Sequence, residues 1–139
     1  MSLIYGLRKI RTDQMVETAI AVGEITENSE VINEICEFIF LHSQYVKSML
    51  SSLKKKLNDD DTQVVMLALS LLDKLWSNGG SHFRRGVSSK KFIPKIKSAC
   101  RSNSEQICLT SRKLVEKWAE NEVKNDESLG RIRILDNVC

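Results

Sequence analysis

Residues 62–80, TQVVMLALSLLDKLWSNGG, limit the possible folds more than any other part of the sequence. Leu, Met and Ala dominate this run, and a strand rarely needs so many residues, so its length and composition favour an α-helix. The acids at 59–61 and Thr62 are candidate N-caps, and Gly79 and Gly80 can adopt the left-handed conformation that ends a helix. A helix that is apolar on nearly every side must be covered by other elements. We therefore expect it to be the central helix of an all-α domain.

The size and charge of the chain set broad limits on its class. A chain of 139 residues fits one domain with its own core, so we expect a single helical domain over residues 1–139. Charged residues make up 28% of the chain and the net charge is +3. This balance predicts a mildly basic, soluble protein, and it gives no reason to expect a nucleic-acid partner.

The four cysteines, Cys36, Cys100, Cys108 and Cys139, form no CxxC pair. Three of them lie on apolar stripes, where a free cysteine behaves as a small hydrophobic residue. A reducing cytosolic setting therefore explains them better than a disulfide framework does. The N-terminus carries no signal-peptide pattern, and the longest apolar run is interrupted by polar residues, so no membrane span is predicted.

Three helices are predicted before the central one. Residues 1–11 read as a short basic lead-in, after which Thr12 would cap a helix that ends at Gly23. Ser29 and Ser43 would cap the second and third helices. The inward positions of the three helices would be Met15, Ala19 and Val22, then Val31, Ile32, Ile35, Cys36 and Ile39, and then Val46, Met49, Leu50, Leu53 and Leu57.

Four further helices are predicted after Gly80. Residues 81–87 can form a short helix, and Ser88 and Ser89 would cap the next one, with Pro94 in its first turn. The spacing of apolar residues from Ile107 to Trp118 predicts a seventh helix, and residues 129–138 an eighth. About eight short-linked helices and no convincing strand favour an antiparallel bundle or a helical superhelix.

The order of these signals resembles the VHS domain, a module of endosomal and Golgi sorting adaptors. The most specific part is VMLALSLLDKLWSNGGSHFRRGVSSKKFI, in which Asn78, Gly80, Phe83, Val87 and Phe92 match the turn and packing positions of the family. The resemblance covers residues 15–135. It implies a right-handed superhelix of about eight helices and a non-enzymatic module that binds other molecules.

The resemblance suggests a peptide groove between the sixth and eighth helices, where family members bind acidic-dileucine sorting signals. The predicted contacts are Lys91, Lys95, Lys97, Arg101, Arg131, Ile132, Ile134 and Leu135. Two departures affect the specificity of this groove. Pro94 stands where the family has Asn, and Asn103 and Ser104 stand where it has a Lys–Tyr pair.

Ubiquitin-binding members of the family carry Trp near the start of the second helix and Leu four residues later. Here Ser29 and Asn33 occupy these positions. Two small polar side chains fit the apolar patch of ubiquitin poorly, which argues against a ubiquitin site.

A second group of cations could meet an anionic membrane or another acidic partner. It comprises Lys47, Lys54 and Lys55 on the third helix together with Arg84 and Arg85. The alternative is a solvated helix face, because lysines near a helix C-terminus also complement its dipole. Six cations lie between Arg84 and Lys97, and two interpretations remain open for them. They either form a binding surface together with Phe83 and Phe92, or they are solvated while Phe83 and Phe92 belong to the core.

No signature of an enzyme or of a metal site is present. The sequence lacks HExxH, GxSxG, a glycine-rich phosphate loop and paired carboxylates, and neither His42 nor His82 has a partner at metal-ligand spacing. A Cys–His pair brought together by folding is the remaining catalytic alternative. Trp76 and Trp118 lie on apolar stripes and are predicted to be core residues. We expect no catalysis, no cofactor and no metal.

These observations lead to one main hypothesis and two alternatives. The main hypothesis is an adaptor module in vesicle trafficking, cytoplasmic and peripheral to endosomal or Golgi membranes, which binds acidic peptides of cargo tails or the nearby anionic lipid. The first alternative is a reader of the RNA polymerase II tail, because LLDKLWSNGG also resembles the turn of that family. The second is a phosphoinositide-binding domain of the epsin type, for which IYGLRKIR would be the basic amphipathic segment.

Overall fold

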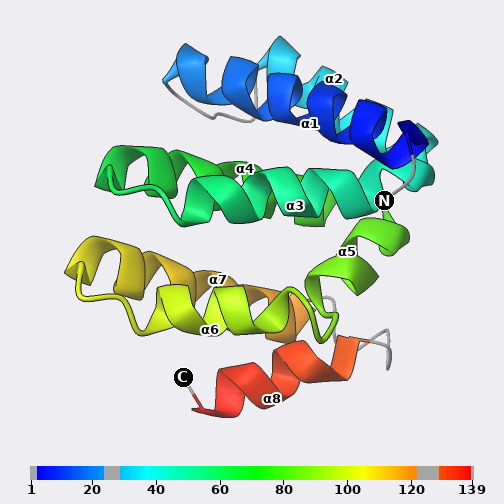
Figure 1. Cartoon of the computed structure of the whole chain (residues 1–139). Helices are drawn as coiled ribbons and strands as arrows, with labels where there is room; N and C mark the ends of the chain where they lie inside the picture. Colours follow the sequence, from blue (N-terminus) through cyan, green and yellow to red (C-terminus); the bar gives the residue numbers. More distant parts are fainter. Residues whose placement is uncertain (1–2, 24–28, 122–128, 139) are drawn as a thin grey trace. The chain divides into compact units, whose positions relative to one another are not determined.

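The computed structural model describes residues 3–23, 29–121 and 129–138 (Figure 1). Within these ranges the protein contains α-helices and one short 3₁₀ helix and no strand, which confirms the predicted all-α class. The elements are α1 (Leu3–Val22), α2 (Glu30–Leu41), η1 (Ser43–Tyr45), α3 (Val46–Leu57), α4 (Thr62–Asn78), α5 (Ser81–Val87), α6 (Ile93–Cys100), α7 (Glu105–Asn121) and α8 (Gly130–Val138).

The contacts divide the chain into two compact units, Met1–Phe83 and Arg84–Cys139. The first unit contains α1 to α4 and the second contains α6 to α8, and α5 crosses the boundary between them. Each unit is described by itself below. The single domain over residues 1–139 stays a prediction.

The apolar run at 62–80 forms α4, which packs against α1, α2 and α3 in the first unit. Its start is fixed by Asp61, whose side chain accepts a hydrogen bond from the backbone N–H of Gln63. The buried residues are Val65, Ala68, Leu69, Leu71, Leu72, Leu75 and Trp76. Within its unit, α4 is therefore the covered helix that the composition predicts.

Only one of the two glycines after α4 has the left-handed conformation. Gly79 has φ −86° and its N–H bonds to the carbonyl of Leu75, whereas Gly80 has φ +97°. Gly79 is needed for a different reason, because a Cβ at this position would lie 2.6 Å from the carbonyl oxygen of Leu75. The expectation was thus right for Gly80 and wrong for Gly79.

The first helix begins earlier than the sequence suggested. α1 starts at Leu3, so Thr12 lies inside it and is not an N-cap. The side chain of Thr12 is buried, and its hydroxyl pairs with that of Ser52 on α3, at 2.8 Å. The buried stripe of α1 is Thr12, Val16 and Ala19, whereas Met15 is half-buried and Val22 is exposed.

The second helix follows the prediction and the third begins later than expected. Ser29 caps α2 and accepts a hydrogen bond from the N–H of Ile32. Ser43 begins the 3₁₀ turn η1, and α3 starts only at Val46. All five positions of α3 predicted to face inward are buried: Val46, Met49, Leu50, Leu53 and Leu57.

In the second unit, α7 packs against both α6 and α8, and α6 also contacts α8. Figure 1 shows that α6 and α8 run in the same direction, with α7 antiparallel to them. Pro94 lies in the first turn of α6, as expected, but the N-cap is Phe92, and Ser89 instead accepts the N–H of Phe92 in the turn before the helix. Phe92 and Trp118 are core residues.

Candidate functional site

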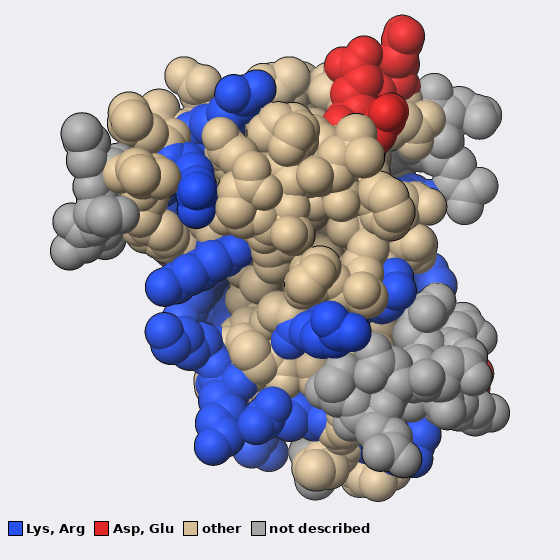
Figure 2. All heavy atoms as spheres, turned by 90° about the vertical axis from the view of Figure 1, so that its right-hand side faces the viewer, with Lys and Arg blue, Asp and Glu red and all other residues tan. Residues whose placement is uncertain are grey.

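Positively charged side chains gather on α6, on the turn that precedes it, and on α8. Lys91, Arg101 and Arg131 are exposed, and Lys97 is half-buried. On the face shown in Figure 2, Lys and Arg side chains lie at many points, and the Asp and Glu side chains in view are confined to one small area. We call Lys91, Lys97, Arg101 and Arg131 the basic face of the second unit.

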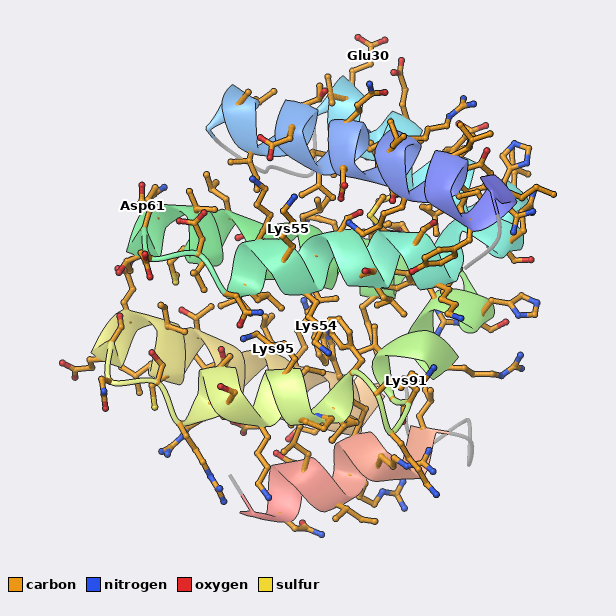
Figure 3. The ribbon with its side chains drawn as sticks, in the orientation of Figure 1. Glu30, Lys54, Lys55, Asp61, Lys91 and Lys95 are labelled. Atoms are coloured by element: carbon orange, nitrogen blue, oxygen red, sulfur yellow. The ribbon has the colours of Figure 1, made fainter. Side chains whose placement is uncertain are left out.

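The buried residues of α6 determine which of its lysines lie toward α8; they are Ile96, Ala99 and Cys100. Residues two apart are about 200° apart around a helix, so Lys95 and Lys97 lie at opposite edges of the exposed surface of α6. Figure 3 shows Lys95 on the side of α6 away from α8. Lys97 therefore lies on the α8 side, one helical turn after the half-buried Ile93. The structure separates Lys95 from the other predicted contacts.

A hydrogen bond joins the start of α8 to the turn before α6. The Nη1 group of Arg131 donates to the backbone oxygen of Ser88, at 3.4 Å. Lys91 lies in the same turn, and Figure 3 shows it on the side where α8 begins. This contact brings two predicted cations, Lys91 and Arg131, to one end of the α6–α8 pair.

The three apolar residues predicted on α8 do not share one environment. Ile132 and Leu135 are 0% and 3% exposed and fill the interior, whereas Ile134 is 65% exposed. Ile134 follows Arg131 by three residues, so both side chains project from neighbouring positions on one side of the helix. Of these three apolar residues, Ile134 is the one that offers surface to a ligand.

The second predicted patch divides between the two units. Lys47, Lys54 and Lys55 are exposed on α3, as expected, and Figure 3 shows Lys54 and Lys55 on different sides of that helix. Arg84 is half-buried and Arg85 exposed, and both belong to the second unit.

The positions that hold Trp and Leu in ubiquitin-binding proteins of this kind are both polar here. Ser29 uses its side-chain oxygen to cap α2, at 3.4 Å from the N–H of Ile32. Asn33 is exposed one turn later. The absence of a ubiquitin site stays a prediction.

An arginine–aromatic cluster in the first unit was not predicted from the sequence. The guanidinium carbon of Arg11 lies 4.8 Å from the ring centroid of Phe38 and 5.9 Å from that of Tyr45. Arg8 lies 5.7 Å from the Tyr45 ring and donates to the backbone oxygen of Gln44. The spacing of Arg8 and Arg11 would have placed them on one helix face, had residues 3–11 been recognised as helical.

A groove of about 380 Å³ lies between α1 and α2, next to this cluster. Its wall includes the apolar side chains of Met15, Ile35 and Phe38, and Arg11 and Glu34 supply opposite charges. The groove is therefore apolar along part of its wall and charged at its edges.

Among the cysteines in the described ranges, Cys36 has a thiol whose pKa is clearly shifted. Cys36 is buried, and desolvation raises the pKa of its thiol to about 11, with a smaller opposing effect of the Lys74 charge. At neutral pH this thiol is therefore protonated and a poor nucleophile. Within the described ranges, no cluster of His, Cys, Asp and Glu could hold a metal ion. Cys139 lies outside the described residues.

No helix in the described part of the chain combines the length and hydropathy needed to cross a membrane.

The model of the VHS-domain family matches residues 9–137. The chain belongs to the VHS-domain family. The match begins within α1 and ends in α8, so it covers most of both units, including α6 and all but the last residue of α8.

Similar proteins are larger than this chain. Vacuolar protein sorting-associated protein 27 of Yarrowia lipolytica is 30% identical over 111 residues, which cover 77% of this chain and 20% of that protein. The protein of the same name in Mycosarcoma maydis is 35% identical over 69 residues, 50% of this chain and 8% of that protein. Class E vacuolar protein-sorting machinery protein HSE1 of Yarrowia lipolytica is 27% identical over 119 residues, 84% of this chain and 17% of that protein. The chain thus spans about a fifth or less of the length of these relatives.

Proposed function

We propose that this VHS domain is a non-enzymatic interaction module of an endosomal sorting adaptor, cytoplasmic and peripheral to endosomal or Golgi membranes. The family match and the relatives named for vacuolar protein sorting support this role. The same names favour trafficking over the alternative of a reader of the RNA polymerase II tail. The sorted cargo would be recognised through its cytoplasmic tail.

The ligand we propose is a short peptide that carries acidic residues next to bulky apolar ones. The supporting observation is the contact of Arg131 with Ser88, which places the start of α8 against the turn that holds Lys91. Lys97 lies on the α8 side of α6 in the same unit. Such a row of cations attracts and orients an acidic segment.

The apolar part of the ligand would contact Ile134 and the neighbouring edge of α6. Ile134 is exposed, and Ile93 is half-buried one turn before Lys97. The aliphatic stem of Lys97 can add apolar contact while its ammonium group stays in water. Ile132 and Leu135 would support this surface from the interior, because both are buried.

Titration of the ¹⁵N-labelled domain with an acidic-dileucine peptide tests the proposal. We expect chemical-shift changes in residues 90–101 and 131–135, and weaker changes with a peptide whose acids are replaced by Ser. The absence of any change at millimolar peptide would exclude this groove. A phosphorylated heptad peptide of the polymerase tail is the comparison ligand, and tighter binding of that peptide would favour the nuclear alternative.

A matched pair of double variants separates a specific site from general attraction to positive charge. Lys91→Gln/Lys97→Gln removes two cations from the basic face, and Lys54→Gln/Lys55→Gln removes two exposed cations from α3. We expect the first variant alone to weaken binding by several-fold, since each cation at the edge of a binding site contributes modestly. Equal losses in both variants would argue against a defined peptide site.

A further inference from the structure

The outer face of α1 carries an apolar stripe near the start of the chain. Ile4, Leu7 and Ile10 are 61%, 58% and 57% exposed, and their spacing of three residues places them along one side of the helix. The opposite side provides the buried residues Thr12, Val16 and Ala19. The helix is thus apolar on two sides, and the core of the first unit uses only one of them.

Cations are the only charged residues in the first twelve positions of the chain. Residues 1–12 contain Arg8, Lys9 and Arg11 and neither Asp nor Glu. Lys9 is neutralised by Asp13, at 2.5 Å. Arg8 and Arg11 form no ion pair with any residue that the structure describes.

Aromatic rings hold these cations beside the stripe without removing their charge. Arg11 lies over the rings of Phe38 and Tyr45, and Arg8 lies over Tyr45. On α3, Lys47 lies 5.3 Å from the ring centroid of Tyr5. A cation–π contact is compatible with a second, ionic partner, because the ring carries no net charge.

From these observations we propose that the first three turns of α1 dock the first unit on an anionic membrane surface. Ile4, Leu7 and Ile10 would enter the boundary between headgroups and acyl chains, and Arg8, Arg11 and Lys47 would contact lipid phosphates. An exposed apolar stripe beside cations, with the nearest acid of the helix, Asp13, already paired with Lys9, is the pattern of a helix that lies on a membrane. A second copy of the chain packed stripe to stripe would instead bring cations against cations.

This inference is independent of the peptide site, because all its residues lie in the first unit. Co-sedimentation with vesicles tests it. We expect the full chain to bind vesicles of phosphatidylcholine with phosphatidylserine and to stay in solution with phosphatidylcholine alone. Equal binding to both kinds of vesicle, or to neither, would overturn the proposal.

Two sets of matched variants assign the binding to this surface. Arg8→Gln/Arg11→Gln should lower vesicle affinity by about five-fold per cation, and Lys54→Gln/Lys55→Gln, with the same change in charge, should lower it clearly less. Leu7→Ser should weaken binding, whereas Leu109→Ser, at an exposed leucine of α7, should not. If the members of either pair lose affinity equally, the contact is not on α1.

A fluorescence measurement gives a second readout that keeps the stripe intact. Trp76 and Trp118 are buried, so their emission should not change when vesicles are added, and any shift in Leu7→Trp comes from the introduced tryptophan. Its emission should shift to shorter wavelength when anionic vesicles are added, and that of Leu109→Trp should not. An unshifted Leu7→Trp spectrum on bound vesicles would overturn the proposal, as would a blue shift that instead accompanies dimer formation without lipid.

Discussion

The hydroxyl oxygens of Thr12 and Ser52 lie 2.8 Å apart and are both buried between α1 and α3. Thr12 also approaches the backbone oxygen of Lys9, at 3.2 Å, and Ser52 approaches that of Ser48, at 3.0 Å. The pair forms a small polar network within an apolar interface.

Thr12→Val should destabilise the first unit by about 1–2 kcal/mol, because it leaves the buried Ser52 hydroxyl with fewer partners. Ser52→Ala should have a similar effect. In a urea-denaturation cycle, the double variant should lose less than the sum of the two single losses, as expected for a coupled pair. The control is Thr18→Val, at an exposed position of the same helix, with an expected change within about 0.5 kcal/mol. Additive losses would show that the two hydroxyls do not interact.

Gly80→Ala should lower stability by about 1–2 kcal/mol, since φ is +97° and the new Cβ would lie 3.1 Å from the Phe40 ring. Gly6→Ala is the opposite case. Gly6 lies within α1 with no atom near the new methyl group, so the substitution should stabilise the helix by about 0.5–1 kcal/mol. Thermal unfolding measures both. Phe40→Ala in the Gly80→Ala background should restore little, because the backbone strain remains.

Asp61→Ala should destabilise α4 by about 1 kcal/mol through loss of its N-cap. The carboxylate accepts the N–H of Gln63 at 2.9 Å, and Figure 3 shows Asp61 at the start of the helix. Asp60→Ala removes the same charge next to the cap and is the control. Similar losses from the two variants, measured by urea denaturation, would mean that charge near the helix end matters more than the hydrogen bond.

The stability of the first unit should fall in acid partly because of Asp13. Burial by itself would raise the pKa of this carboxyl, but the hydrogen bonds from Lys9 and Ser52 and the charges of Lys9 and Lys55 outweigh it and lower the pKa below the usual 3.8. A carboxyl whose folded pKa is lowered contributes stability above its unfolded pKa, and this contribution is lost as the pH falls through the folded pKa. Asp13→Asn should therefore be less stable than the wild type at neutral pH and lose less on acidification. Parallel pH profiles of unfolding would contradict this.

The sequence alone predicts those helices whose apolar residues can only face the core. The run at 62–80 has the length and composition of a covered helix, and α2 and α3 have a single apolar stripe each. The N-cap character of Thr12 predicts a shorter α1 than the structure has, because the sequence of α1 does not reveal the partner of Thr12 on α3. Helix propensity describes a residue in isolation, whereas the hydroxyl of Thr12 pairs with a residue 40 places later in the chain.

The candidate site was predicted by residue type and corrected by geometry. Ile132, Ile134 and Leu135 all suit an apolar surface, but the packing of α8 buries the first and third. The arginine–aromatic cluster could not be read from spacing, because it combines α1, α2 and η1. The periodicity of a single helix predicts neither the burial of Ile132 and Leu135 nor the arginine–aromatic cluster.

The separation of Lys95 and Lys97 around α6 gives the sharpest test of the peptide site. Both carry the same charge three residues or fewer from Pro94, so general attraction to an acidic peptide would treat them alike. Figure 3 shows Lys95 on the side of α6 away from α8. Lys97 lies about 200° further around the helix and therefore on the α8 side. Lys97→Gln should therefore weaken binding of an acidic-dileucine peptide by about two- to five-fold, and Lys95→Gln by less than about two-fold. Calorimetric titration at low salt measures both constants. Equal effects, or a larger effect of Lys95→Gln, would place the peptide on another side of α6.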